Sequence, residues 1–168
     1  MAPEPTTLFR EAMARLPAAV HVITTKGPAG THGTTATALT SLSDAPPSLL
    51  VCINRQARLH DILHENGSFC ANLLAGPQAD VAAAFANGAL DPAARFAATG
   101  PWGETVLDGH CYLGHPGAQS RLACRVERAI AHVTHTLFIG AVVAIELAEP
   151  GAEPALLYHR RAFTRLPA

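Results

Sequence analysis

Residues 20–53 read VHVITTKGPAGTHGTTATALTSLSDAPPSLLVCI, and this stretch decides the fold class. Three runs that favour strands (20–25, 31–43 and 48–53) are separated by a Gly-Pro turn at 27–30 and an Asp-Ala-Pro-Pro turn at 44–47. β-branched residues favour strands, whereas Gly, Pro and Asp favour turns. Because these turns are too short to contain a crossover helix, the stretch predicts three consecutive antiparallel strands.

Three short helices are predicted outside this stretch. In the first, Thr7 is the expected N-cap, Phe9, Met13 and Leu16 recur at helical spacing, and Pro17 ends the helix. We expect this helix to be an amphipathic lid. The others are predicted over 56–66, with Gly67 as C-cap, and over 78–85.

Further strands are predicted along the rest of the chain, at 68–74, 104–107, 110–113, 120–131, 136–147 and 155–158. The segment 87–103 contains two glycines and two prolines besides its ends, and we expect a long loop with a function there. Seven or eight strands with three short helices predict a mainly β fold, a closed or nearly closed barrel. A length of 168 residues predicts one domain, 1–168.

Composition narrows the functional classes. The formal charge of -1 provides no cationic field for nucleic acid. Hydrophobic residues make up 49% and charged residues only 15%, which favours an oligomer with an apolar interface. The charged N-terminal stretch is unlike a secretory signal, and no apolar run is long enough for a membrane span, so we expect a cytoplasmic protein without membrane contact.

No metal site is predicted. Cys52, Cys70, Cys111 and Cys124 are too scattered for a metal or redox motif, and the common nucleotide, zinc-protease and serine-hydrolase signatures are absent. His60 and His64 could share a helix face, but no further ligand accompanies them. The pair His132 and His135 would lie on different strands if a turn falls at 133–134, where each histidine is either structural or in contact with a ligand.

Five stretches, in order, resemble the short-chain flavin reductase family: FREAMARLPAAVHVITT, GTTATALTSLSDAPPSLLVCINRQARLHDIL, GSFCANLL, RFA…GPWGETVLDG and AHVTHTLFIGAVV. The resemblance extends from about residue 8 to residue 166. It implies a split β-barrel, FMN-binding fold and a homodimer. It also implies an NAD(P)H-dependent flavin reductase that transfers hydride from nicotinamide C4, of NADH or NADPH, to N5 of FMN or FAD. Such enzymes supply reduced flavin to a partner monooxygenase.

The resemblance also implies site residues. His135 matches the histidine of the family's Gly-Asp-His motif, which is associated with the nicotinamide nucleotide. The positions that match the family's flavin site are Thr35, Ala36, Thr37, Thr40, Ser41, Cys52, Ile53, Asn54, Arg55, Arg58, Ala71, Asn72 and Arg95, and Tyr158 is expected at a ring or at the second subunit. Small side chains would admit a flat ring, and guanidinium groups would pair with phosphate. Each position also has an ordinary structural interpretation as strand, core or surface.

The sequence departs from the family at two places. Val133 and Thr134 replace the Gly and Asp before His135, and Ala38 and Ala57 replace two serines of the phosphate region. These changes keep two other functions open: a non-catalytic flavin-binding protein, and a reductase whose acceptor is ferric iron or a corrinoid. A metal-binding histidine protein ranks behind both.

Overall fold

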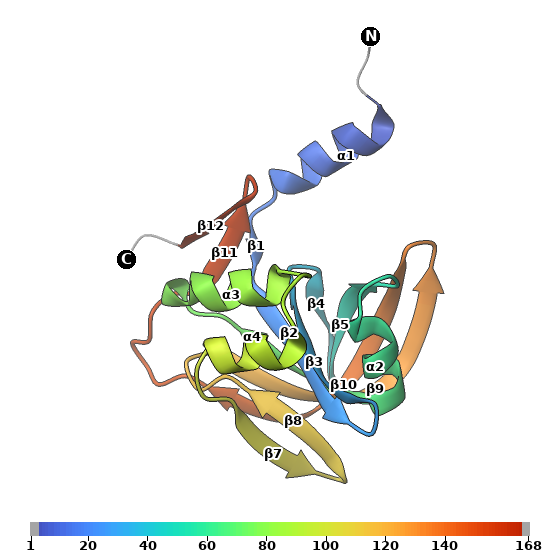
Figure 1. Ribbon diagram of the computed structural model, residues 1–168, viewed down its shortest axis with the longest axis vertical. Coiled ribbons are helices and arrows are strands. Elements are labelled where there is room, and N and C mark those ends of the chain that lie inside the picture. The colour runs from blue at the N-terminus through green and yellow to red at the C-terminus, as the bar shows by residue number, and fades with distance from the viewer. Residues whose placement is uncertain (1–3, 166–168) are drawn as a thin grey trace.

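A computed structural model describes residues 4–165 (Figure 1). Within this range the chain is mainly β, as predicted, with twelve strands and a few short helices. The helices are α1 (Pro5–Ala14), α2 (Leu59–Asn66), α3 (Ala79–Ala86) and α4 (Pro92–Ala98), with a 3-10 turn, η1 (Gly76–Gln78), before α3. The expected single domain 1–168 includes terminal residues that lie outside the described range, and no helix described is long and apolar enough to cross a membrane.

Nine strands form the main sheet. They are β2 (His21–Gly27), β3 (Gly30–Ala36), β4 (Leu39–Asp44), β5 (Pro47–Asn54), β6 (Ser68–Leu73), β7 (Gly103–Leu107), β8 (His110–Gly114), β9 (Ser120–His132) and β10 (His135–Leu147). Their order is β4-β5-β10-β9-β6-β2-β8-β7, and β3 pairs with β2. All the pairings are antiparallel, which agrees with the short turns of the sequence.

The run 31–43 is not one strand, as predicted, but two. β3 pairs with β2, whereas β4 pairs with β5, and the chain changes partner at Thr37 and Ala38. At this break the amide of Cys52 donates to the Ala38 carbonyl at 2.9 Å. The consequence is that β3 and β4 bring the two ends of the sheet back toward each other, and within residues 4–165 the outer edge of β3 has no strand partner.

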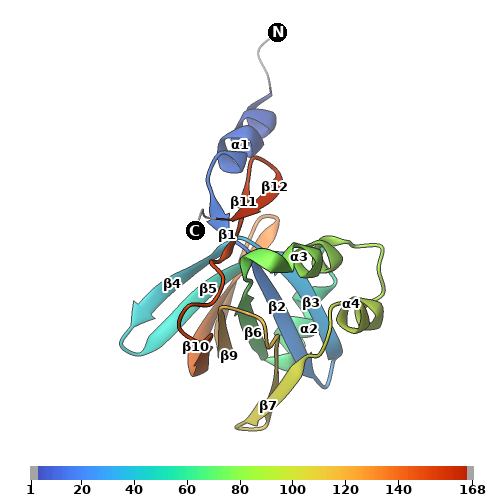
Figure 2. The same ribbon diagram turned by 90° about the vertical axis from the view of Figure 1, so that its left-hand side faces the viewer.

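A second, three-stranded sheet lies at the end of the molecule beside α1 (Figure 2). It contains β1 (Ala18–Ala19), β11 (Leu156–His159) and β12 (Ala162–Arg165). The prediction included β11 but missed the short strands β1 and β12. The β11–β12 hairpin contacts α1 through the Arg160 amide, which donates to the Ala14 carbonyl at 2.7 Å, and through an Arg161–Glu11 ion pair.

The helix predictions were partly right. Gly67 is the C-cap of α2, with φ of 66°, as predicted. Glu4 and not Thr7 is the N-cap of α1, because Pro5 fits the first helical position. The predicted loop at 87–103 contains α4, whose N-cap Asp91 accepts a hydrogen bond from the Ala93 amide at 2.9 Å. Asp-Pro followed by helix-forming residues was the local signal that the loop interpretation overlooked.

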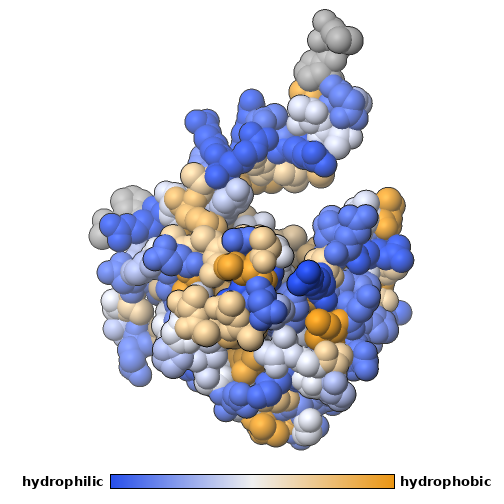
Figure 3. All heavy atoms as spheres, viewed as in Figure 1, coloured by the Kyte–Doolittle hydropathy of each residue, from blue (hydrophilic) through white to orange (hydrophobic). Residues whose placement is uncertain are grey.

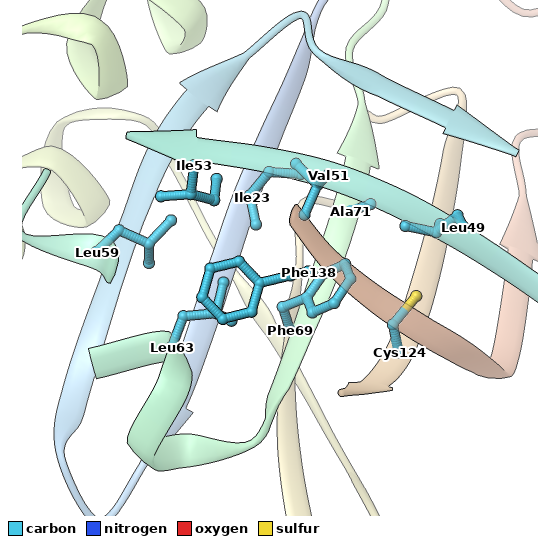
Figure 4. Packing of buried hydrophobic residues seen from close by; sticks show 10 residues of the cluster. All are labelled: Ile23, Leu49, Val51, Ile53, Leu59, Leu63, Phe69, Ala71, Cys124 and Phe138. Atoms are coloured by element: carbon cyan, nitrogen blue, oxygen red, sulfur yellow. The ribbon is translucent and has the colours of Figure 1, made fainter. Parts of the chain in front are cut away.

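The main hydrophobic cluster fills the space between α2 and the curved sheet (Figure 4). Phe69 and Phe138 are fully buried, and Leu59 and Leu63 of α2 pack with them. Burying a side chain of this size contributes roughly 1.5–3 kcal/mol. α2 is therefore fixed on the sheet by its apolar face.

A second cluster holds α3 and α4 on the other side of β3. Phe85, Phe96 and Trp102 form edge-to-face pairs with centroids 5.0–5.3 Å apart. Gly33 of β3 makes this approach possible, because a Cβ there would lie 2.6 Å from the Phe85 ring. β3 is thus enclosed by α2 on one side and by α3 and α4 on the other.

The stability of the fold should depend on the protonation of His21. This side chain is 7% exposed, and burial lowers its pKa from 6.5 to about 4. Above pH 6.5 the ring is neutral in both the folded and unfolded states. As the pH falls toward 4 only the unfolded state gains the proton, so the free energy of unfolding should fall by about 3 kcal/mol.

Urea unfolding of the wild type and of His21→Gln between pH 7 and pH 4 measures this contribution. The glutamine variant keeps a polar side chain without a titrating ring, so its stability should fall less over this range. If the free energy of unfolding depends on pH equally in the two proteins, His21 does not couple protonation to folding.

Candidate functional site

The β9–β10 hairpin places His135 beside the end of β5. Val133 and Thr134 form its two-residue loop, as predicted, and His132 pairs with His135 across it. On its other edge His135 pairs in register with Asn54 of β5. The two histidines therefore lie on neighbouring strands and not on one.

Arg55 and Thr134 stabilise this corner. The Arg55 amide donates to the Thr134 carbonyl at 2.9 Å, and its guanidinium Nη1 donates to the Val133 carbonyl at 3.3 Å. The Thr134 hydroxyl lies 2.9 Å from Nδ1 of His135. Because Nδ1 is engaged, Nε2 is the ring nitrogen that can meet a ligand.

A hollow of about 370 Å³ opens at this corner. It is lined by Asn54, Arg55, Gln56, His60, Asp61, Val133 and Thr134. His60 contacts Asp61 through Nδ1 at 2.6 Å and the Thr136 hydroxyl through Nε2 at 2.8 Å. Asp61 therefore places a carboxylate at the hollow. The turn itself has none, because Thr134 stands where the family has an Asp.

A larger hollow of about 590 Å³ lies over the C-terminal end of β3. Thr35, Ala36 and Thr37 form one wall, and Tyr158 and Phe163 of the β11–β12 hairpin form another. Ala83, Ala86 and Asn87 at the end of α3 complete it. Figure 3 shows a notch on the same side of the molecule, between α1 and the body.

α1 borders a third hollow of about 590 Å³, which shares Thr37, Tyr158 and Arg161 with the second. Its other walls include Phe9 and Met13 of α1, and Leu16, which lies two residues beyond the end of this helix. These side chains are 63%, 47% and 57% exposed, respectively. The predicted lid therefore stands beside the site, with its apolar face uncovered.

Several predicted site residues lie away from these hollows. Ile53, Ala71 and Asn72 are buried, at 2%, 0% and 0% exposure, and line none of the three hollows, so their expected place near the flavin stays a prediction. Asn72 instead joins three strands: its amide donates to the Val22 carbonyl of β2 at 3.1 Å and its oxygen accepts from the His115 amide, next to β8, at 2.8 Å. These polar groups have no free capacity for a ligand.

The remaining predicted residues have mixed positions. Thr40 and Ser41 are exposed on β4, and Cys52 is half-buried on β5. Arg58 is exposed at the N-cap of α2. Arg95 is 3% exposed, so it is neither a surface side chain nor part of a surface salt bridge, and its Nη1 donates to the Gly33 carbonyl at 3.1 Å.

Sequence reasoning missed some of the lining residues. Ala83, Ala86 and Asn87 come from α3, and only their small size, which keeps the hollow open, could have suggested them. Tyr158, which was expected at a ring or at the second subunit, lines the same hollow together with Phe163.

Comparison with known proteins agrees with this geometry. A family model described as "Flavin reductase like domain" matches residues 13–167. The chain is 42% identical over 157 residues to "FMN reductase (NADH) RutF" of Stutzerimonas stutzeri, covering 91% of this chain and 84% of the relative. It is 38% identical over 161 residues to the "4-hydroxyphenylacetate 3-monooxygenase reductase component" of Pseudomonas aeruginosa, covering 94% and 90%.

A solved structure is similar over nearly the same length. This is the NADH:FAD oxidoreductase SgcE6 of Streptomyces globisporus in complex with NAD and FAD fragments. The TM-score is 0.85 at 25% identity, and the match covers 99% of this chain and 96% of that one.

The hairpin before His135 provides a stability prediction. Val133 has φ of 47°, a conformation that a β-branched residue adopts only at a cost of about 1–2 kcal/mol or more. Glycine removes this strain but increases the entropy of the unfolded chain by about 0.5–1 kcal/mol. Val133→Gly should therefore raise the free energy of unfolding by up to about 1 kcal/mol.

Thr134→Gly is the matched control, because Thr134 is not among the residues with positive φ. It should lower the stability by about 0.5–1 kcal/mol. Chemical denaturation of both variants tests the pair, and a destabilised Val133→Gly protein would contradict the strain argument.

Proposed function

The chain belongs to the flavin reductase-like family, and from this premise we propose that it is an NADH-dependent flavin reductase. The hollow beside Thr35, Ala36 and Thr37 is the observation that supports this function best. Small side chains on one wall and the rings of Tyr158 and Phe163 on another suit a flat, tricyclic ring.

The cationic groups suit the phosphate end of the same ligand. Neither Arg58 nor Arg95 makes an ion pair within residues 4–165. Neither arginine is part of β3, but both lie near this strand, which carries Thr35 and Ala36. Guanidinium groups without a carboxylate partner are well suited to phosphate.

FMN or FAD, when bound, supplies the hydride acceptor, and NADH supplies the hydride. This chemistry requires close stacking and the exclusion of water but no nucleophile or base from the protein. We assign the task of positioning the nicotinamide to His135, which is exposed beside Asn54, with Thr134 holding its Nδ1. NADPH is the less favoured donor, because Asp61 at the nearby hollow would repel an added phosphate.

We also propose the detailed architecture, a single-domain split β-barrel that forms a homodimer. The return of β3 and β4 toward β5 supports a split β-barrel of the FMN-binding type, within a single domain. The uncovered side chains of α1 and of the sheet, among them Phe9, Ile145 and Leu147, support a homodimer.

Relatives that are reductase components support a partner monooxygenase, which receives the reduced flavin by diffusion. An enzyme that consumes NADH would work in the cytoplasm, where NADH is available. A flavin carrier without activity, and a reductase that serves ferric iron or a corrinoid, remain the competing functions, and the second would not depend on added flavin.

Anaerobic mixing of catalytic amounts of protein with NADH and excess FMN tests the proposal. The flavin absorbance should bleach fully over many turnovers, since each turnover releases the reduced flavin. Bleaching of only one flavin per protein would favour a bound cofactor, and no bleaching would favour the carrier.

His135→Ala should raise the KM for NADH about tenfold, because one hydrogen bond that orients the nicotinamide is lost. The dissociation constant of FMN should stay within twofold, as His135 is assigned only to the nicotinamide. His132→Ala, on the neighbouring strand, is the control and should change neither value. A weaker affinity for FMN in the His135 variant would place this residue at the flavin instead.

Sedimentation equilibrium tests the homodimer. The mass should be twice the chain mass of 17.5 kDa. Phe9→Asp would shift the mass toward the monomer if α1 contributes to the interface, because an unpaired charge in an apolar interface is costly. Arg10→Asp, at the next position, controls for added charge.

A further inference from the structure

His32 is a buried histidine without a hydrogen-bond partner. It lies on β3 and is 3% exposed, and neither ring nitrogen makes a hydrogen bond. The Gly33 backbone is near enough to favour the charged ring slightly, but burial dominates and lowers the pKa. Buried polar groups nearly always have partners, because an unpaired one loses its hydration without compensation.

A second orphaned group lies beside it. Arg95 reaches over β3 from α4, and while its Nη1 donates to the Gly33 carbonyl, its buried Nε has no partner. The nearby Asp91 is already the N-cap of α4 and accepts from the Ala93 amide. The Arg95 guanidinium is therefore buried without a carboxylate of its own, and burial lowers its pKa.

Arg58 brings a third cation to the same place. It is exposed at the N-cap of α2, and its charge acts on both His32 and Arg95 by lowering their pKa values, after the larger effect of burial. α2 and α4 both pack against β3, so Arg58, at the N-cap of α2, and Arg95, in α4, lie on elements that flank the strand of His32. Unpaired donors and neighbouring positive charges together suit an anionic ligand.

We infer that His32 is a third ligand of the flavin phosphate, beside Arg58 and Arg95, and that the three together select FMN over riboflavin and FAD. The inference rests on the proposed function, because it assumes that flavin is the ligand. Its new element is His32, which no resemblance assigned, as a residue that determines the choice of flavin.

Charge and depth explain the selection. The terminal phosphate of FMN carries close to two negative charges and several acceptor oxygens, enough for three donors. Each phosphate of FAD carries one charge, and its adenosine would have to pass the covered His32 and Arg95. Riboflavin has no phosphate. Arg58, the exposed member of the three, would meet the anion first.

Flavin fluorescence titrations of the full-length protein, without NADH, test the inference. The wild type should bind FMN at least tenfold more tightly than riboflavin or FAD. His32→Gln should weaken FMN binding about tenfold, the loss expected for one charge-assisted hydrogen bond, and should leave riboflavin binding within twofold. Arg58→Gln should show the same selective loss.

His21→Gln is the matched control. It makes the same substitution at another buried histidine with an unpartnered nitrogen, on the adjacent strand β2. Its binding of both flavins should equal that of the wild type. Circular dichroism and the unchanged riboflavin affinity would show that His32→Gln is folded.

Equal weakening of FMN and riboflavin by His32→Gln, or no change in either, would overturn the inference, as would a wild type that prefers FAD. The proposed function fails differently. If the wild type binds FMN selectively but NADH never bleaches it, the reductase proposal is wrong while the phosphate assignment stands.

Discussion

The outer edge of β3, which has no strand partner, is the constraint on which the rest of the structure depends. β2 pairs with β3 and β6 and also contacts β8, so the sheet continues away from β3. The chain then leaves β3 at Thr37 and Ala38 to pair elsewhere. Helices pack against β3 in place of a further strand. At this strand the Gly33 carbonyl accepts a hydrogen bond from Arg95. The hollow above Thr35 to Thr37 exists because the sheet does not close there.

Around this edge the molecule accepts local costs. His32 and Arg95 are buried with unpaired nitrogens at β3, and Val133, in the β9–β10 hairpin, has a backbone conformation that glycine prefers. Natural proteins break such local rules mainly at functional sites, where a ligand or a required geometry offsets the cost. Asn72, by contrast, is fully buried and paired: it donates to the Val22 carbonyl and accepts from the His115 amide. Within residues 4–165, Nδ1 of His21 and the Ser68 hydroxyl are two further buried groups without a partner, outside the proposed site.

Local signals predicted those features whose cause is local. Gly67 ends α2 because only a residue without Cβ adopts its positive φ easily, and the hairpin at Val133 follows from two apolar strands that need a short connection. α4 was missed because prolines and glycines around it masked a short helix whose stability comes from packing Phe96 against Phe85 and Trp102. β1 and β12 are too short to have a periodicity, and only their pairing with β11 forms them.

The sequence by itself determined the class of fold, the antiparallel pairing and the family, since strand propensity, turn residues and ordered motifs are written along the chain. It also named Thr35 to Thr37, Arg55 and His135, which the structure brings to hollows or to their rim. Only the tertiary structure decided that Ile53, Ala71 and Asn72 are buried, and that Arg95 reaches from α4 to the Gly33 carbonyl beside the buried His32. Which face of a strand is buried, and which distant helix covers it, depends on contacts between segments far apart in the chain, and no local pattern records them.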